Sequence, residues 1–219
     1  ESRDPRLQMA VITPYAQYNG ASSGIAHTYT LRWPYRGSDS AEPFDIRTDT
    51  NDKFYYLWRK FVPEGLEQTE RDTYGLDIPL IRYAEVLLLK AEALNEWGST
   101  HESEAIRCVN EVRRRAGHVE LNNATYPATK VNGQSDLRER IRNEYYWEIG
   151  GEDSMYFHEL RWGTWKDKKF DNNRNGLMQM WGETTYTWYW LGDQCWSWPI
   201  PAKEMEMNSN LEQNEGWIN

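Results

Sequence analysis

Aromatic side chains that carry a polar atom are the most distinctive chemical groups of this 219-residue sequence. The chain contains 12 Trp and 14 Tyr but only 5 Phe, and its net charge is −9. Rings that only filled a core would include more Phe, whereas rings with a polar atom suit half-exposed positions. Such rings bind protein partners, stacked bases or the faces of sugars. Nucleic acid is disfavoured, because base stacking normally accompanies a positive groove and the chain has no basic tail or stripe.

The aromatic residues gather in three clusters. The first is Tyr15, Tyr18, Tyr29, Trp33 and Tyr35; the second is Tyr55, Tyr56 and Trp58; the third is Trp181, Tyr186, Trp188, Tyr189, Trp190, Trp196 and Trp198. Alternate side chains of an extended backbone share a face, so Tyr186, Trp188 and Trp190 are expected to point the same way. Packing against a scaffold is the alternative for any single ring, but it explains the whole set poorly.

Patterns that would support catalysis are weaker. Glu144 and Glu148 lie four residues apart on one helix face, whereas a glycoside hydrolase needs two carboxylates across a cleft. A solvated stripe, or a pair for Arg140, is the alternative. The string from Gly20 to Gly24 matches G-x-S-x-G, but it lacks the preceding buried strand and following helix of a nucleophile elbow, so we interpret it as a loop. We therefore expect no enzymatic activity.

Metal-binding patterns are also incomplete. Asp171, Asn173 and Asn175 fit the first half of a calcium-binding loop, but Gly182 stands where that loop needs a carboxylate. These residues are a weak calcium candidate, with a polar turn as the alternative. The four histidines lack the spacing of a zinc site, and the two cysteines form neither a disulfide scaffold nor a metal motif. No cofactor is expected.

A helical hairpin is expected to position the aromatic segments. From Ile81 to Trp97 the apolar residues cover most of a helix circumference, so we expect this helix to pack on nearly every side. Its solvent strip would consist of Glu85, Glu92 and Glu96. The helix includes a run of four consecutive apolar residues, 86–89, which is far too short to span a bilayer.

The second helix of the hairpin is expected to follow at once. Ser99 and Glu102 have the spacing of a capping box, and Gly117 ends the apolar periodicity. A turn this short requires antiparallel helices. Ala91 and Ala105 fall near the tetratricopeptide pattern, with a plain αα-hairpin as the alternative.

The rest of the chain combines helices with irregular, aromatic-rich stretches. Further helices are expected at 136–149 and 153–162, and short strands at 8–12, 27–33 and 53–62. We divide the chain into an aromatic loop-and-strand segment (1–79), a helical scaffold (80–162) and an irregular aromatic C-terminal segment (163–219).

Residues 78–95 resemble the hallmark helix of the SusD/RagB-like outer-membrane lipoproteins of Bacteroidetes. Further matching motifs follow in the family's order: Ala105-Ile106, Val109 to Gly117, Ile141, Glu144, Gly151-Glu152, Glu159 to Gly163, Trp198-Pro199-Ile200-Pro201, Glu204, Asn208, Asn210-Leu211, Gln213-Asn214 and Gly216-Trp217. The family often has Arg where this chain has Tyr145, and again where it has Met155 and Tyr156. These departures look like scaffold positions.

The resemblance implies an all-α fold of tetratricopeptide-like hairpins with long irregular loops and a few short strands. It covers only the C-terminal part of a SusD-like protein, and neither Cys108 nor Cys195 is the lipidated cysteine. It also implies a non-enzymatic, surface-exposed subunit of polysaccharide utilisation in the outer membrane. This subunit would capture an oligosaccharide or polysaccharide and deliver it to a SusC-like TonB-dependent transporter. Membrane association would depend on a lipid anchor outside this chain.

Binding loops are expected in the segment before the hallmark helix. The first-choice site is therefore Tyr18, Asn19, Tyr29, Arg32, Trp33 and Tyr35; the second is Tyr186, Trp188 and Trp190. Rings would stack on sugar faces while polar side chains bind hydroxyl groups. A protein- or peptide-binding tetratricopeptide-like module and a glycoside hydrolase remain the alternative functions.

Overall fold

A computed structural model describes most of the chain in two compact units. The described residues are 4–13, 16–22, 25–32, 45–47, 57–62, 64, 77–152, 154–169, 190 and 192–217. The first unit is Glu1–Met155 and the second is Tyr156–Asn219. The three segments expected from sequence, 1–79, 80–162 and 163–219, remain a proposal.

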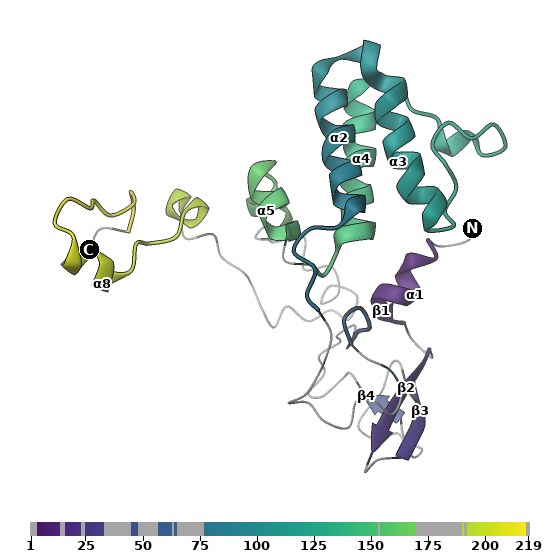
Figure 1. Ribbon diagram of the computed structural model, residues 1–219, viewed down its shortest axis with the longest axis horizontal. Helices are drawn as coiled ribbons and strands as arrows, with labels where there is room; N and C mark the ends of the chain where they lie inside the picture. Colours follow the sequence, from purple (N-terminus) through teal and green to yellow (C-terminus); the bar gives the residue numbers. More distant parts are fainter. Residues whose placement is uncertain are drawn as a thin grey trace. The chain divides into compact units, whose positions relative to one another are not determined.

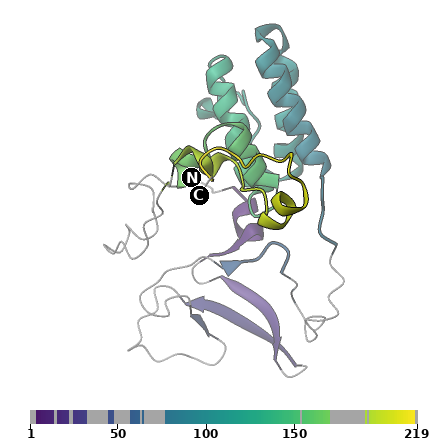
Figure 2. The same cartoon turned by 90° about the vertical axis from the view of Figure 1, so that its left-hand side faces the viewer.

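Three helices form the scaffold of the first unit. Helix α2 (Tyr83–Trp97) and α3 (Glu102–Arg115) form a hairpin through the short 3₁₀ turn η3 (Ser99–His101), and α4 (Gln134–Ile149) packs beside them. Figures 1 and 2 show these helices side by side. The expected helical hairpin and third helix are confirmed. With the few short strands described below, this is the all-α, tetratricopeptide-like class expected from sequence.

The core lies where these three helices meet. Side chains with almost no exposed surface include Leu88, Ala91, Val109, Leu137, Ile141 and Tyr145. They recur at three- and four-residue steps along each helix, as the apolar periodicity requires. Burial of such faces supplies the main stabilising free energy of a helical hairpin, because short helices are marginal alone.

Two expectations for the hairpin are wrong. Helix α2 is not packed on every side: Tyr83, Val86, Leu89 and Trp97 form an exposed apolar strip, while Glu85, expected in the solvent strip, is buried. Side chains three or four residues apart share one helix face, so this strip is the side of α2 turned away from its partners. The expected capping box is also absent, since neither α3 nor η3 has a side-chain cap hydrogen bond.

The segment between α3 and α4 is fixed by one buried amide. Asn110 donates from Nδ2 to the carbonyl of Leu121 at 3.2 Å, and its Oδ1 accepts from the backbone N–H of Leu121 at 2.7 Å. Leu121 and Val131 bury their side chains in the same unit, and the turn η4 (Pro127–Thr129) lies between them. The segment between α3 and α4 is therefore packed against the scaffold.

Short strands and one short helix precede the scaffold. Helix α1 (Arg6–Ala10) leads into β1 (Val11–Ile12), which pairs antiparallel with β5 (Leu57–Trp58). Strands β2 (Gln17–Ser22) and β3 (Ile25–Arg32) form an antiparallel pair, the purple arrows of Figure 2, and β4 (Asp45–Arg47) adds parallel to β3.

The sequence located these strands only in part. The expected strand at 27–33 corresponds to β3, but most of the expected strand at 8–12 is helix α1. The expected strand at 53–62 is limited to β5 within the described part of that segment. The G-x-S-x-G string starts inside β2 rather than in a loop, because Gly20 to Ser22 are strand residues.

The second unit is held by its own aromatic and amide contacts. It contains most of α5 (Ser154–Arg161), α6 (Trp165–Lys169), the 3₁₀ turn η5 (Asp193–Trp196) and α8 (Ala202–Met207). The Gln213 amide bonds both the N–H and the carbonyl of Ile200, at 2.7 and 2.9 Å. The indole of Trp217 donates to the carbonyls of Gln194 and Ser197. Across the described ranges, no helix is both long enough and apolar enough to span a bilayer.

Candidate binding site

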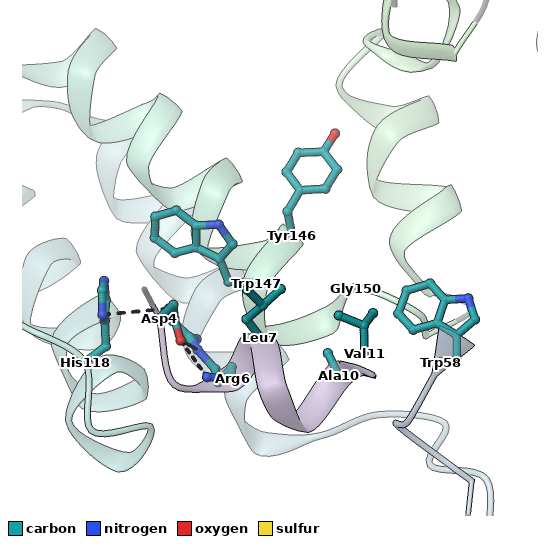
Figure 3. A pocket seen from close by; sticks show the side chains of 10 residues that line it. All are labelled: Asp4, Arg6, Leu7, Ala10, Val11, Trp58, His118, Tyr146, Trp147 and Gly150. Carbon is teal, nitrogen blue, oxygen red and sulfur yellow. Dashed lines mark hydrogen bonds and ion pairs between the residues drawn. The ribbon is translucent and has the colours of Figure 1, made fainter. Parts of the chain in front are cut away.

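An aromatic pocket of about 410 Å³ opens in the first unit between α1 and the end of α4. Its lining residues are Asp4, Arg6, Leu7, Ala10, Val11, Trp58, His118, Tyr146, Trp147 and Gly150. In Figure 3, Trp58 lies at one end, Asp4 and His118 lie at the other, and Trp147 and Tyr146 extend from α4 between them. We call this hollow the aromatic pocket.

Local sequence explains how the rings reach the pocket. Tyr146 and Trp147 are consecutive near the end of α4, on the side opposite its buried stripe of Leu137, Ile141 and Tyr145. Strand pairing places Trp58 at the pocket, because its backbone lies opposite Val11 in the β1–β5 register. As a result, 54 % of Trp58 and 43 % of Trp147 remain exposed, so both indoles are covered on one side and wet on the other.

Glycine at position 151 allows the Trp58 ring to lie close to the backbone. Gly151 has φ of +81°, and a Cβ atom there would lie 2.8 Å from the Trp58 ring. A larger residue would therefore be strained in its backbone and would also displace the indole. The Gly150-Gly151 pair thus ends α4 and makes room for one wall of the pocket.

Polar groups occupy one end of the pocket. Arg6 donates to both carboxylate oxygens of Asp4, at 2.9 and 2.6 Å, and His118 Nδ1 lies 3.9 Å from the same carboxylate. The His118 ring meets Trp147 edge to face, with 5.8 Å between centroids. Burial, together with the nearby Arg113 cation, lowers the pKa of His118, so the imidazole is neutral at pH 7. A neutral imidazole offers one donor and one acceptor to a hydroxylated ligand.

A buried charge cluster supports the floor of the pocket. Arg6 contacts Glu144 at 2.7 Å and Glu148 at 3.1 Å, and Arg113 donates to Glu144 at 2.9 Å. Burial raises the pKa of Glu144 in spite of the two arginines, because removal from water disfavours the carboxylate. This cluster ties α1 and α3 to α4.

The cluster corrects the interpretation of Glu144 and Glu148. They are neither a solvated stripe nor partners of Arg140, which pairs with Asp136 at 3.0 Å instead. Both carboxylates are almost fully buried and held by guanidinium groups. A glycoside hydrolase pair faces a substrate-filled cleft, whereas Glu144 is buried between two guanidinium groups.

A second set of ion pairs fixes the segment that carries Trp58. Lys60 Nζ donates to the carbonyls of Glu148 and Gly150, at 2.8 and 3.3 Å, at the C-terminal end of α4. A cation is favourable there because the last carbonyls of a helix are unpaired and carry partial negative charge. Arg82 donates to Glu148 and Glu152 at 2.7–3.1 Å and joins the start of α2 to the same point.

The structure brings together part of the first-choice site expected from sequence. Tyr18 and Tyr29 are opposite each other in the β2–β3 register, with 6.5 Å between ring centroids. Beside them, Thr28 Oγ1 donates to Asn19 Oδ1 at 3.1 Å. Arg32 is the last residue of β3. Trp33 and Tyr35 lie outside the described residues.

The second-choice site is described only at Trp190. Its ring lies 4.9 Å from that of Trp196 and 5.4 Å from Lys166 Nζ, within the second unit. Tyr186 and Trp188, and the calcium candidates Asp171, Asn173 and Asn175, lie outside the described residues. Where side chains are described, no group of three His, Cys, Asp or Glu residues is placed to hold a metal ion.

Sequence reasoning missed Tyr146, Trp147 and His118 as site residues. A signal was present in the run Tyr145-Tyr146-Trp147 at the end of an expected helix. Helical periodicity buries Tyr145 with Leu137 and Ile141, which leaves the next two rings on another face. His118 carried no comparable signal, because a histidine just after a helix has many structural roles.

Comparison with known proteins gives a consistent family. A family model described as the SusD family matches residues 1–217. The chain is 32 % identical over 139 residues to "SusD-like protein P38" of Formosa agariphila, covering 63 % of this chain and 24 % of that protein. It is 28 % identical over 161 residues to "Starch-binding protein SusD" of Bacteroides thetaiotaomicron, covering 73 % and 25 %. The chain thus spans about a quarter of the length of these curated relatives.

A solved structure supports the fold. The crystal structure of a SusD-like protein from Bacteroides fragilis NCTC 9343 aligns with a TM-score of 0.65 at 22 % identity. The alignment covers 99 % of this chain and 39 % of that chain. At this level of identity the likeness concerns the fold alone.

Proposed function

Since this chain belongs to the SusD family, we propose that it binds carbohydrate without chemically altering it. In this proposal it acts on the cell surface as part of an outer-membrane lipoprotein. It captures oligosaccharides and delivers them to a SusC-like TonB-dependent transporter. The starch-binding relative supports carbohydrate as the ligand class.

The observation that carries the proposal is the aromatic pocket. Its two half-exposed indoles, Trp58 and Trp147, present flat apolar faces to solvent, and Asp4 and His118 provide polar atoms at one end. A pyranose has the matching surface, with apolar C–H faces and a rim of hydroxyl groups. Ligand sites of this kind are mostly apolar with a few polar groups that fix orientation.

The Tyr18–Tyr29 pair is proposed as a second surface for the same ligand class. Its phenol rings lie across neighbouring strands, and Asn19 supplies an amide beside them. Arg32, Trp33 and Tyr35 belong to the same proposal, as do Tyr186, Trp188 and Trp190 as a further platform. An extended saccharide can use several ring platforms in succession.

The direct test is binding to immobilised glycans. Trp147→Ala is expected to reduce retention in affinity electrophoresis by about tenfold, the factor that corresponds to about 1.4 kcal/mol for a central aromatic contact. Trp58→Ala should act in the same direction. The matched control is Trp97→Ala, because Trp97 is an exposed indole outside the pocket lining. Circular dichroism must show the same helix content in all three variants.

Two results would reject the proposal. No retention on any glycan, combined with capture of a peptide or protein partner, would favour a protein-interaction module. Release of shorter saccharides from candidate polysaccharides would indicate a glycoside hydrolase. Equal retention by Trp147→Ala and Trp97→Ala would keep carbohydrate binding but remove it from the aromatic pocket.

A further inference from the structure

A second hollow adjoins the aromatic pocket, and four of its eight lining residues are cations. It measures about 140 Å³ and is lined by Arg6, Met9, Ala10, Lys60, Arg82, Arg115, Trp147 and Glu148. Arg6, Ala10 and Trp147 also line the aromatic pocket. We call this smaller space the Arg115 hollow. Its four cationic side chains stand out in a chain whose net charge is −9.

The cations of the hollow face solvent more than the carboxylates do. The side chain of Arg115 is 58 % exposed and that of Arg82 is 28 % exposed, whereas Glu148 is only 3 % exposed. Glu152, which pairs with Arg82 and Lys60, is likewise almost buried. An approaching ligand therefore meets the positive groups first. The buried carboxylates interact mainly with the arginine and lysine side chains that they are paired with.

Arg115 has hydrogen-bonding capacity that its neighbours lack. Arg82 uses all three of its side-chain nitrogens on Glu148 and Glu152, and Lys60 contacts three oxygens. Arg115 donates only through Nη2, to Glu148, and its Nε and Nη1 have no acceptor among the described residues. A guanidinium with two nitrogens available is suited to a planar or tetrahedral anion.

Two further charged groups lie near this hollow. Behind Trp147, the buried Arg113 is paired with Glu144 at 2.9 Å, so it adds no uncompensated charge. On the other side, Arg82 and Arg115 also line a hollow of about 240 Å³ that contains the carboxylate of Glu111. Glu111 would repel an anion there, so the Arg115 hollow is the favourable side.

We infer that the Arg115 hollow binds the anionic group of an acidic saccharide, a uronate carboxylate or a sulfate ester. This inference rests on the proposed carbohydrate binding and narrows its substrate class. Ring stacking in the aromatic pocket and charge recognition by Arg115 would then act on one ligand, because Trp147 lines both spaces. A neutral glucan would use only the ring contacts.

The test compares three ligands of similar length by calorimetry: a neutral glucan oligosaccharide, an oligogalacturonide and a sulfated galactan oligosaccharide. At least one acidic ligand should bind more tightly than the neutral one. Its affinity should fall several-fold between about 0.05 and 0.5 M salt, because salt screens exposed charges, while neutral binding stays constant. The two acidic ligands distinguish carboxylate from sulfate as the preferred anion.

Variants of Arg115 test whether this side chain causes the preference for acidic saccharides. Arg115→Gln should weaken acidic-saccharide binding about tenfold, as expected for one charge-assisted hydrogen bond worth about 1.4 kcal/mol, and leave neutral binding unchanged. Arg115→Lys should retain part of the affinity. The matched control is Arg107→Gln, which removes the same charge from a side chain of α3 that is 66 % exposed. Arg107→Gln should have no effect on either ligand.

The outcomes separate this inference from the proposed function. Equal binding of neutral and acidic saccharides, or equal loss in Arg115→Gln and Arg107→Gln, would overturn the Arg115 assignment while carbohydrate binding stands. Binding of the neutral glucan alone would do the same. Failure of all three saccharides to bind would overturn both.

Discussion

Arg6 Nη1 donates to Glu148 Oε2 at 3.1 Å, across 142 positions of sequence. This contact joins the first described helix to the last turn of α4. Because Arg6 also contacts Glu144, one guanidinium connects the wall of the aromatic pocket to the centre of the scaffold. The shape of the site and the stability of the fold are therefore coupled through the same side chain.

Glu144→Ala is expected to destabilise the first unit. The change leaves an unfilled space in the core and removes the carboxylate that lies against Arg6 and accepts from Arg113, and a buried donor left without its acceptor costs about 1–3 kcal/mol. The free energy of unfolding from urea titration at pH 7 measures the loss. Glu139→Ala, on an exposed stretch of α4, is the control and should change little. Coincident curves for the two variants would refute the structural role of the cluster.

Glu148 is expected to make the free energy of unfolding depend on pH in the acidic range. Burial alone raises the pKa of Glu148, but hydrogen bonds from Arg82 and Arg6 outweigh it and hold the pKa below its ordinary value. A carboxyl with a lowered folded-state pKa stabilises the fold above its unfolded pKa of about 4.3, and this contribution disappears as pH falls through the folded value.

We therefore expect the difference in unfolding free energy between the native chain and Glu148→Gln to be constant above about pH 5 and to shrink at lower pH. Glu144 should behave oppositely, since burial raises its pKa and its ionisation costs stability as pH rises. Chemical denaturation at several pH values measures both. A Glu148→Gln difference that grows on acidification would contradict the assigned ion pairs.

Two neighbouring leucines provide a matched test of which face of α2 is buried. Leu88 is 0 % exposed and Leu89 is 41 % exposed. Leu88→Ala should cost about 2–5 kcal/mol because it leaves a cavity among packed helices, whereas Leu89→Ala should cost well under half of that. Thermal or urea unfolding of the two variants compares them directly. Similar losses would mean that the outer face of α2 is covered in solution.

The first-choice site from sequence is tested by removing its rings. Tyr18→Ala combined with Tyr29→Ala should lower retention on the glycan that the chain binds, and Trp33→Ala combined with Tyr35→Ala should abolish it. Each lost central ring contact is expected to cost on the order of tenfold in affinity. Affinity electrophoresis with circular dichroism as the folding control measures the effect. Unchanged retention in both double variants would place the binding surface elsewhere.

The helices were predictable because their signals are local. The apolar periodicity of α2 and α4 and the glycine after α2 define where each helix begins and ends. The exposed strip of α2 was not predictable, because an apolar residue in a helix shows the same pattern whether or not a neighbour covers it. Glu85 was misjudged for the same reason: its burial depends on packing rather than on its position in the period.

The site was less predictable than the fold. Half-exposed rings were expected from the excess of Trp and Tyr, but which rings converge depends on contacts between distant segments. Trp58 reaches the pocket through pairing with Val11, and Arg6 reaches Glu148 from the other end of the chain. Neither contact produces a periodic pattern of residue types in the sequence. Glu144 and Glu148 likewise have the spacing of surface residues, because their arginine partners are on other elements.

The uncovered strip of α2 has a practical consequence for handling this chain in water. Contiguous apolar surface promotes self-association, so preparations should lose material at high concentration and in high salt. Polar replacements at Tyr83, Val86 and Trp97 should improve solubility with little change in melting temperature, because these side chains bury little area. One step around the helix, at Leu87 or Ala91, the same replacements would unfold the protein.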